Sequence, residues 1–206
     1  MKQITIIDYG SGNVLSAQKS FVKVTNENNI EAKVLISKKL IDIKNSSHIV
    51  LPGQGAFSTC ITELKKTPGL VDELQEFALV KKKPFLGICV GMQMLANDSE
   101  ENGLHEGLGW IDGHIKALPA KNLKLPHMGW NLVNPKCNNN LINSSEDYYF
   151  VHSYYFACKN NENILAESQY GITFTSIVVK ENIYGVQFHP EKSSSQGLNL
   201  IKNFVS

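Results

Sequence analysis

The feature that most constrains the fold is a regular alternation of short apolar segments and helical patterns in the first half of the chain. The apolar segments have the length of buried strands and lie at 3–8, 32–36, 48–51 and 84–88. Apolar residues at helical spacing occupy about 13–26, 70–80 and 90–97. Strands separated by helices need crossover connections, so this half predicts a mainly parallel sheet covered by helices.

The second half has a different pattern. Its strand-like runs are interrupted by Gly, Asn and Pro and lie at 110–117, 129–133, 148–152, 172–180 and 183–188. These runs favour antiparallel strands added to the parallel core, followed by a final helix near 195–205. The segments 138–143 and 159–163 are predicted to be exposed loops. We therefore expect an α/β fold, with a mixed, mostly parallel sheet flanked by helices, in one domain over 1–206.

Composition limits the possible partners. The chain has 206 residues, of which 42% are hydrophobic and 19% charged, and its net charge is +1. This balance is typical of a globular protein and indicates neither nucleic acid nor a membrane as the main partner. No apolar run is long enough for a membrane span or a signal peptide, and the four cysteines show no paired spacing. We therefore expect free thiols and a cytoplasmic location.

The strongest local feature is the pentapeptide Gly87-Ile88-Cys89-Val90-Gly91, which joins an apolar strand to a helical pattern. A serine in this arrangement is the nucleophile of the α/β-hydrolases, whose tight turn requires small neighbouring residues. A position at a helix N-terminus favours the thiolate, and the backbone N–H of Val90 is placed to stabilise an oxyanion. Most free cysteines are small packing residues, so the pentapeptide alone supports a nucleophile and a packing residue equally.

A cysteine nucleophile needs a base, and the segment around His189 distinguishes one of the six histidines. His48, in a predicted strand, and His105 and His114, among glycine-rich turns, are explained by packing or solvent exposure. His189 lies two residues before Glu191, and residues two apart in an extended segment project from the same face. The carboxylate can hold one ring nitrogen and leave the other for the thiol. Alone, this segment is better explained as a strand-end turn with a surface ion pair, but together with the cysteine turn it favours a catalytic pair.

A third feature is the glycine-rich segment PGQGAF at 52–57, between a short strand and a helical pattern. Glycines there let the backbone approach a ligand or turn its N–H groups toward one. The segment lacks the Gly-Lys-Ser/Thr ending of a phosphate-binding P-loop. By itself it indicates only a turn.

The order PGQGAF, GICVGMQ and QFHPEKS resembles that of the class I (triad) glutamine amidotransferases. The resemblance implies that Cys89 is the nucleophile, His189 the general acid and base, and Glu191 its orienting partner. It also implies that the loop with Gly53 and Gly55 supplies the second oxyanion donor.

Three further motifs narrow the resemblance: IDYGSGN at 7–13, PHMGWN at 126–131 and YFVHSY at 149–154. Together they are similar to the glutaminase subunits of imidazole glycerol phosphate synthases, from residue 4 to about residue 205. By this resemblance a set of residues lines the glutamine pocket, namely Gln93, Glu101, His152, Ser153 and Tyr154. A second set faces the partner subunit, namely Asn13, Trp130, Tyr149 and Lys192. Core packing, a solvated charge or a helix cap explains the second set equally well.

The resemblance implies hydrolysis of glutamine to glutamate and ammonia without a cofactor or metal. The ammonia passes to a (β/α)₈-barrel cyclase subunit, in a heterodimer, that makes imidazole glycerol phosphate and AICAR for histidine biosynthesis. Glutaminase activity is expected to be nearly silent until the partner binds its ligand. The loop departs from the commoner PGVG form by carrying Gln54, which places a long polar side chain beside the oxyanion loop.

Three other functions fit parts of the pattern. A paralogous glutaminase feeds ammonia to a cyclase-like partner that amidates surface sugars. A cysteine hydrolase or peptidase uses the same turn, although Gln93 and Glu101 disfavour it. A catalytically inactive scaffold subunit is disfavoured by the intact Cys89, His189 and Glu191.

Overall fold

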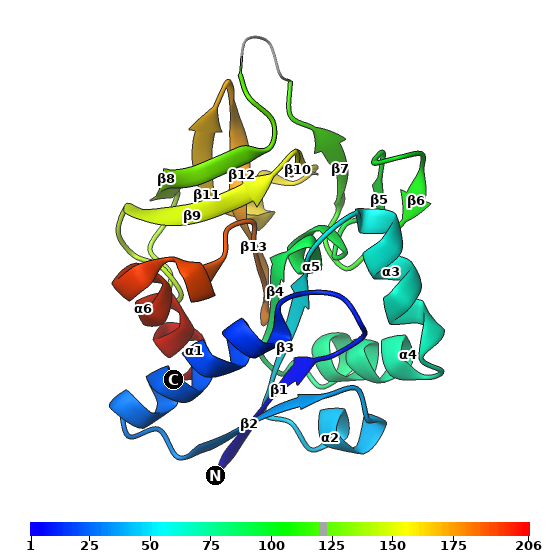
Figure 1. The fold of residues 1–206 in the computed structure, drawn as a ribbon, viewed down its shortest axis with the longest axis vertical. Helices are drawn as coiled ribbons and strands as arrows, with labels where there is room; N and C mark the ends of the chain where they lie inside the picture. The colour runs from blue at the N-terminus through cyan, green and yellow to red at the C-terminus, as the bar shows by residue number, and fades with distance from the viewer. Residues whose placement is uncertain (120–122) are drawn as a thin grey trace.

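The parallel half of the sheet is formed by five strands (Figure 1). The structure is a computed structural model that describes residues 1–119 and 123–206. The five strands lie in the order β2 (Ala32–Ser37), β1 (Lys2–Ile7), β3 (His48–Gly53), β4 (Phe85–Cys89) and β13 (Ile183–Val186). Each pairs with its neighbour in parallel. Strands β3 and β4 are fully buried, as expected for central strands covered on both faces.

Mostly antiparallel pairings extend the sheet beyond β13, with β5 and β7 as the parallel exception. The strands that continue its path are β12 (Ile172–Lys180), β10 (Tyr154–Cys158), β7 (Gly113–Ala117), β5 (Asp98–Ser99) and β6 (His105–Glu106). A branch leaves β12 through β11 (Ile164–Tyr170), β8 (His127–Pro135) and β9 (Glu146–His152). The antiparallel region is larger than expected, because β10 and β11 did not stand out in the sequence. Ala166 and Ser168 of β11 are buried without an apolar alternation that would indicate a strand.

Helices cover both faces of the parallel strands. Helices α1 (Val14–Glu27) and α6 (Ser194–Val205) pack together on one face, whereas α3 (Phe57–Lys66) and α4 (Leu70–Gln75) lie on the other (Figure 1). A π-helical turn, Glu76–Val80, continues α4, and α2 (Leu40–Lys44) is a short helix beside it. The predicted fold class, a mixed sheet flanked by helices, is confirmed, but the expectation of a mostly parallel sheet is wrong. Among the described residues, seven strand pairings are antiparallel and five are parallel.

The two predicted loops differ in detail from the expectation. The segment 138–143 has no regular structure, but Leu141 and Ile142 are buried in the core and are not exposed. Within 159–163, Asn161–Asn163 form a 3₁₀ turn and Asn163 is buried, where its side chain donates to the Val179 carbonyl. Among the described residues, no helix has the length and apolar character needed to cross a membrane.

Candidate active site

The parallel register brings three separate segments to one edge of the sheet. Gly53 at the end of β3 is the partner of Cys89 at the end of β4. On the other side of β4, Val186 at the end of β13 is the partner of Ile88. The glycine-rich loop, Cys89 and the segment leading to His189 therefore leave the sheet side by side, at the carboxyl ends of parallel strands, where open α/β sheets bind their ligands.

The turn at Cys89 is strained and crowded. Cys89 has φ +55° and ψ −112°, a backbone conformation that residues other than glycine rarely adopt. A Cβ atom on Gly91 would lie 1.8 Å from the Leu51 carbonyl oxygen, and one on Gly87 would lie 2.6 Å from the Gly91 oxygen. Only glycine fits at these two positions, so the sequence can form the sharp strand-to-helix turn that the pentapeptide predicted.

The helix after this turn is shorter than predicted. The helical pattern over 90–97 suggested two turns, but α5 spans only Val90–Gln93. The carbonyl groups that follow accept hydrogen bonds from a later segment of the chain. The Met94 carbonyl accepts from Leu108 N, and the Leu95 carbonyl accepts from Trp110 N and Ile111 N. Tertiary hydrogen bonds therefore replace the helical ones, and the helix dipole at Cys89 comes from a single turn.

His189 and Glu191 form a buried pair. His189 Nδ1 lies 2.9 Å from Glu191 Oε1, and the two side chains are only 6% and 4% exposed. The contact is made by a 3₁₀ turn over Pro190–Lys192 and not by the extended segment that we expected. Ser193 holds this turn, since its hydroxyl donates to the His189 carbonyl and accepts from Tyr149 N.

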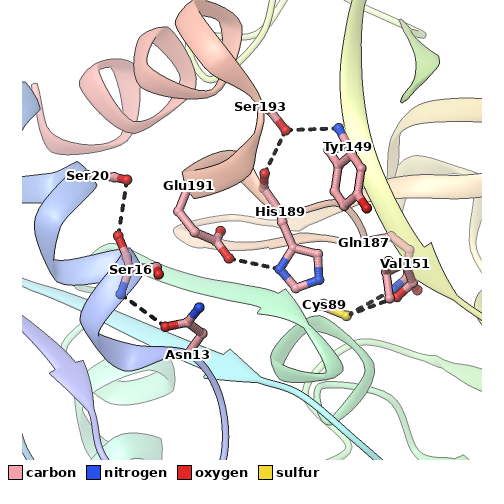
Figure 2. A network of polar contacts seen from close by, with 10 residues as sticks. All are labelled: Asn13, Ser16, Ser20, Cys89, Tyr149, Val151, Gln187, His189, Glu191 and Ser193. Carbon is pink, nitrogen blue, oxygen red and sulfur yellow. Dashed lines mark hydrogen bonds and ion pairs between the residues drawn. The ribbon is translucent and has the colours of Figure 1, made fainter. Parts of the chain in front are cut away.

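The imidazole of His189 lies between Glu191 and Cys89 (Figure 2). Burial opposes the charged imidazolium, but the neighbouring Cys89 thiol and the Glu191 carboxylate outweigh it and raise the pKa of His189 to about 10. The carboxylate holds one ring nitrogen, and the other is turned toward the sulfur. This geometry suits proton transfer between the sulfur and the ring.

Gln187 is a further residue at the sulfur that the sequence interpretation did not single out. It is fully buried, and its Nε2 donates to Cys89 Sγ at 3.8 Å. Cys89 Sγ also lies 3.9 Å from the Val151 carbonyl oxygen (Figure 2). Gln187 lies two residues before His189, which is the same spacing that the sequence interpretation used to pair His189 with Glu191, and applying it to Gln187 would have identified this residue.

The glycine-rich loop lies beside Cys89, and one of its carbonyl groups is held by hydrogen bonds. The Gln54 carbonyl accepts from the Ser11 hydroxyl at 2.9 Å and from the Cys60 thiol at 3.4 Å. Gly55 has φ +100°, which favours glycine. A Cβ on Gly53 would lie 2.5 Å from Gly91 N, so this glycine lets the loop touch the turn.

One cavity of about 310 Å³ brings together most of the predicted site residues. Cys89 and His189 line it together with Val90, Gly55 and the five residues predicted for the glutamine pocket, Gln93, Glu101, His152, Ser153 and Tyr154. Gly53 lies outside it and lines a smaller cavity with Glu191. Glu101 also joins this cavity to the glycine-rich loop, because its Oε2 accepts from Phe57 N at 2.7 Å.

Of the four residues predicted to face a partner, one lines this cavity and one lines the smaller cavity. Lys192 lines the cavity and is exposed, and Trp130 is 53% exposed with its ring edge-on to Tyr149. Asn13 caps α1 through Ser16 N and lines the small cavity beside Glu191. No group of three or more His, Cys, Asp or Glu in the described part of the chain could hold a metal ion.

Comparison with known proteins shows the family of the chain. The family described as glutamine amidotransferase class-I matches residues 5–206. An imidazole glycerol phosphate synthase subunit HisH from Rhodospirillum rubrum is 41% identical over 209 residues, covering 98% of each chain. The subunit of the same name from Pelagibacter ubique is 43% identical over 208 residues, covering 98% of this chain and 99% of its own.

Solved structures show the same fold at lower identity. A crystal structure of a glutamine amidotransferase superposes with a TM-score of 0.71 at 17% identity, covering 97% of this chain and 96% of its own. A glutamine amidotransferase from Thermotoga maritima superposes with a TM-score of 0.64 at 21% identity, covering 95% of this chain and 78% of its own.

Proposed function

The chain belongs to the class-I glutamine amidotransferases and, within them, to the family of imidazole glycerol phosphate synthase subunit HisH, and on this premise we propose how its site hydrolyses glutamine. The observation that carries the proposal is that Cys89, on a strained strand-to-helix turn, and His189 line one cavity, with the buried Glu191 carboxylate paired to His189. In this proposal Cys89 is the nucleophile, His189 the general acid and base, and Glu191 the residue that orients His189.

The first half of the reaction releases ammonia. The Cys89 thiolate adds to the carboxamide carbon of glutamine, and the carbonyl π electrons move to the oxygen. Backbone N–H groups of Val90 and of the loop with Gly53 and Gly55 stabilise this oxyanion. The His189 imidazolium gives its proton to the departing nitrogen, the C–N bond breaks, and ammonia leaves a γ-glutamyl thioester on Cys89.

The second half of the reaction regenerates the free Cys89 thiolate. Neutral His189 takes a proton from a water molecule as the water oxygen adds to the thioester carbon. Collapse of the intermediate breaks the C–S bond, releases glutamate and returns the thiolate beside the imidazolium. The raised pKa of His189, held up by Cys89 and by Glu191, keeps the imidazole protonated and ready to give a proton to the next departing nitrogen.

Ammonia is a nucleophile only when neutral, and in bulk water near pH 7 most of it is protonated. The chemistry therefore favours a site docked against the enzyme that consumes ammonia. We propose that the partner is the (β/α)₈-barrel cyclase subunit, which makes imidazole glycerol phosphate and AICAR in histidine biosynthesis. The cytoplasmic location expected from the sequence stays a prediction.

An exposed apolar face on β8 supports docking next to the cavity. Met128, Trp130 and Leu132 are 62%, 53% and 43% exposed and alternate along the strand, so they project from one face. Large apolar side chains gathered on one face mark protein interfaces. We propose that this face, with Asn13, Tyr149 and Lys192, meets the cyclase.

The test is glutaminase activity measured on the isolated chain and on its complex with the cyclase, with and without the cyclase's nucleotide ligand. Ser11 and Cys60 hold the Gln54 carbonyl, which supports a loop kept in one arrangement until the partner acts. We expect low activity from the isolated chain and a large increase in the liganded complex. High turnover by the isolated chain would refute the gating, and no glutaminase activity under any condition would refute the function.

The sugar-amidating alternative is not favoured, because the relatives that match over almost the whole chain carry the synthase name. Growth without added histidine separates the two pathways. The chain should rescue a histidine auxotroph that lacks its own glutaminase subunit. Failure to rescue despite soluble expression would favour the sugar-amidating function instead.

A further inference from the structure

At the wall of the glutamine cavity, which His152 lines, lies a buried pair of histidines that no step of the proposed reaction uses. His127 on β8 and His152 on β9 are opposite each other in the strand register. They are only 4% and 6% exposed, and His127 Nδ1 lies 2.9 Å from His152 Nε2. The ring of Tyr170 stacks on His127 with centroids 4.0 Å apart, which fixes the plane of that imidazole.

The partners of the pair fix the direction of every hydrogen bond in it. His152 Nδ1 lies 2.9 Å from the Tyr154 carbonyl oxygen, which can only accept, so this nitrogen carries a proton. In a neutral ring Nε2 is then an acceptor, so His127 Nδ1 donates to it. His127 Nε2 accepts in turn from Asn131 Nδ2 at 3.2 Å, and the other amide hydrogen of Asn131 goes to the Gln169 carbonyl at 2.8 Å.

This neutral arrangement satisfies all four ring nitrogens. If His152 were charged, its Nε2 would donate, and His127 would carry its proton on Nε2, facing the N–H of Asn131. Two donors would then point at each other in a buried site, which is costly. Burial lowers the pKa of His127 to about 4 and that of His152 to about 3, in agreement with two neutral rings near pH 7.

The same chain of hydrogen bonds continues to the nucleophile. The Tyr154 carbonyl also accepts from Gln93 Nε2 at 3.2 Å, and the second hydrogen of that amide goes to Gln187 Oε1 at 3.1 Å. Gln187 Nε2 then donates to Cys89 Sγ at 3.8 Å. The Tyr154 carbonyl is therefore the point where the histidine pair meets the amides that reach the sulfur.

We propose that His127 and His152 are positioning residues of the glutaminase, which hold the Tyr154 carbonyl through a one-directional relay and so set the amides of Gln93 and Gln187 beside the sulfur. It follows that His152 has no ring nitrogen left for glutamine. Its side chain shapes the cavity wall but does not form a hydrogen bond with the substrate. The positioning role rests on the proposed glutaminase function, whereas the hydrogen bonds of the relay do not depend on it.

The tautomers are measured without any activity assay. Long-range ¹H–¹⁵N spectra of the full chain, labelled with ¹⁵N-histidine, report which ring nitrogen carries the proton. Both His127 and His152 should be neutral and protonated at Nδ1 at pH 7. A proton on Nε2 of either ring, or a doubly protonated ring, would overturn the relay. This result stands whether or not the complex hydrolyses glutamine, so failure of the relay and failure of the proposed function are distinguishable.

Two variants at His127 separate positioning from simple packing. His127→Phe keeps an aromatic ring but removes both nitrogens, so kcat/KM for glutamine in the cyclase complex should fall about tenfold, the effect of one unsatisfied buried acceptor. His127→Asn places an amide nitrogen where Nδ1 stood, and it should restore kcat/KM to within about threefold of the native value and keep His152 protonated at Nδ1.

The matched control is His48→Phe, at a buried histidine outside the site that bonds Ser47. Its kcat/KM should equal that of the native chain. Equal impairment of His127→Phe and His127→Asn, or full activity of His127→Phe, would overturn the proposal. If His127→Phe does not fold, the Asn variant and the tautomer spectra still decide, because an inactive but folded Asn variant contradicts the relay.

Discussion

Replacing Glu191 by glutamine removes one charge from the site and almost no volume. Glu191 Oε1 lies 2.9 Å from His189 Nδ1, and both side chains are almost fully buried, so solvent cannot replace the lost charge. A hydrogen bond to a charged group contributes about 1.5–3 kcal/mol, which corresponds to a loss of roughly 10- to 150-fold in rate. Glu191 does not line the glutamine cavity, so the loss should appear in kcat with KM nearly unchanged.

The assay is steady-state glutamate release by the complex with the cyclase, for Glu191→Gln and for the control Glu181→Gln. Glu181 pairs with Lys82 on the surface, where an ion pair contributes little, so the control should keep full activity. Because the Glu191 carboxylate helps to raise the pKa of His189, an NMR titration of His189 should also show a lower midpoint in Glu191→Gln. Retention of more than about half of kcat, or an unchanged His189 midpoint, would refute the assigned role of Glu191.

Three further predictions concern the turn at Gly91, the amide of Gln187 and the buried histidines. Gly91→Ala places a methyl group 1.8 Å from the Leu51 carbonyl oxygen, so we expect little soluble protein and a strongly lowered melting temperature, whereas a native-like melting curve would contradict the crowded turn. Gln187→Leu removes the amide that donates to Cys89, so alkylation of that thiol by iodoacetamide at pH 7 should slow, and an unchanged rate would exclude the contact. The free energy of unfolding should decrease as the pH falls from about 6.5 to 4, because the unfolded chain binds protons there that the folded chain excludes, on the order of 1.4 kcal/mol per pKa unit. The groups responsible are three buried histidines whose pKa values burial lowers to about 4, 4 and 3, namely His48, His127 and His152. Urea unfolding at several pH values measures the decrease, and a His48→Phe variant with an equally steep decrease would contradict it.

The parallel half of the fold could be predicted because its central strands, β3 and β4, are apolar runs that are buried on both faces. Strand β11 could not, since its buried positions include Ala166 and Ser168, whose small or polar side chains give no apolar period. The short helix α5 shows the opposite error: the segment after Gln93 has helical spacing, but carbonyl groups at 94–97 bond to the chain at 107–111. Such long-range hydrogen bonds leave no local signal in the sequence.

The candidate site also contains residues that the sequence identified and contacts that it did not. Cys89, His189 and Glu191 stand in short motifs whose local geometry carries their chemistry, so the sequence was sufficient to nominate them. The bond from Ser11 to the Gln54 carbonyl joins residues 43 positions apart, and only the folded chain reveals it. The partners of His152 likewise come from two other strands, β8 and β10, which is why the full hydrogen bonding of its two ring nitrogens was not foreseen.

The most direct test of the central claim compares glutamine and ammonia as nitrogen donors for the complex with the cyclase. Cys89→Ala should abolish the glutamine-dependent reaction but leave the reaction supported by ammonium salt at alkaline pH unchanged, because ammonia then bypasses the glutaminase. Cys137→Ala, at an exposed cysteine, should leave both reactions intact. Glutamine-dependent turnover that persists in Cys89→Ala would contradict the account of this active site.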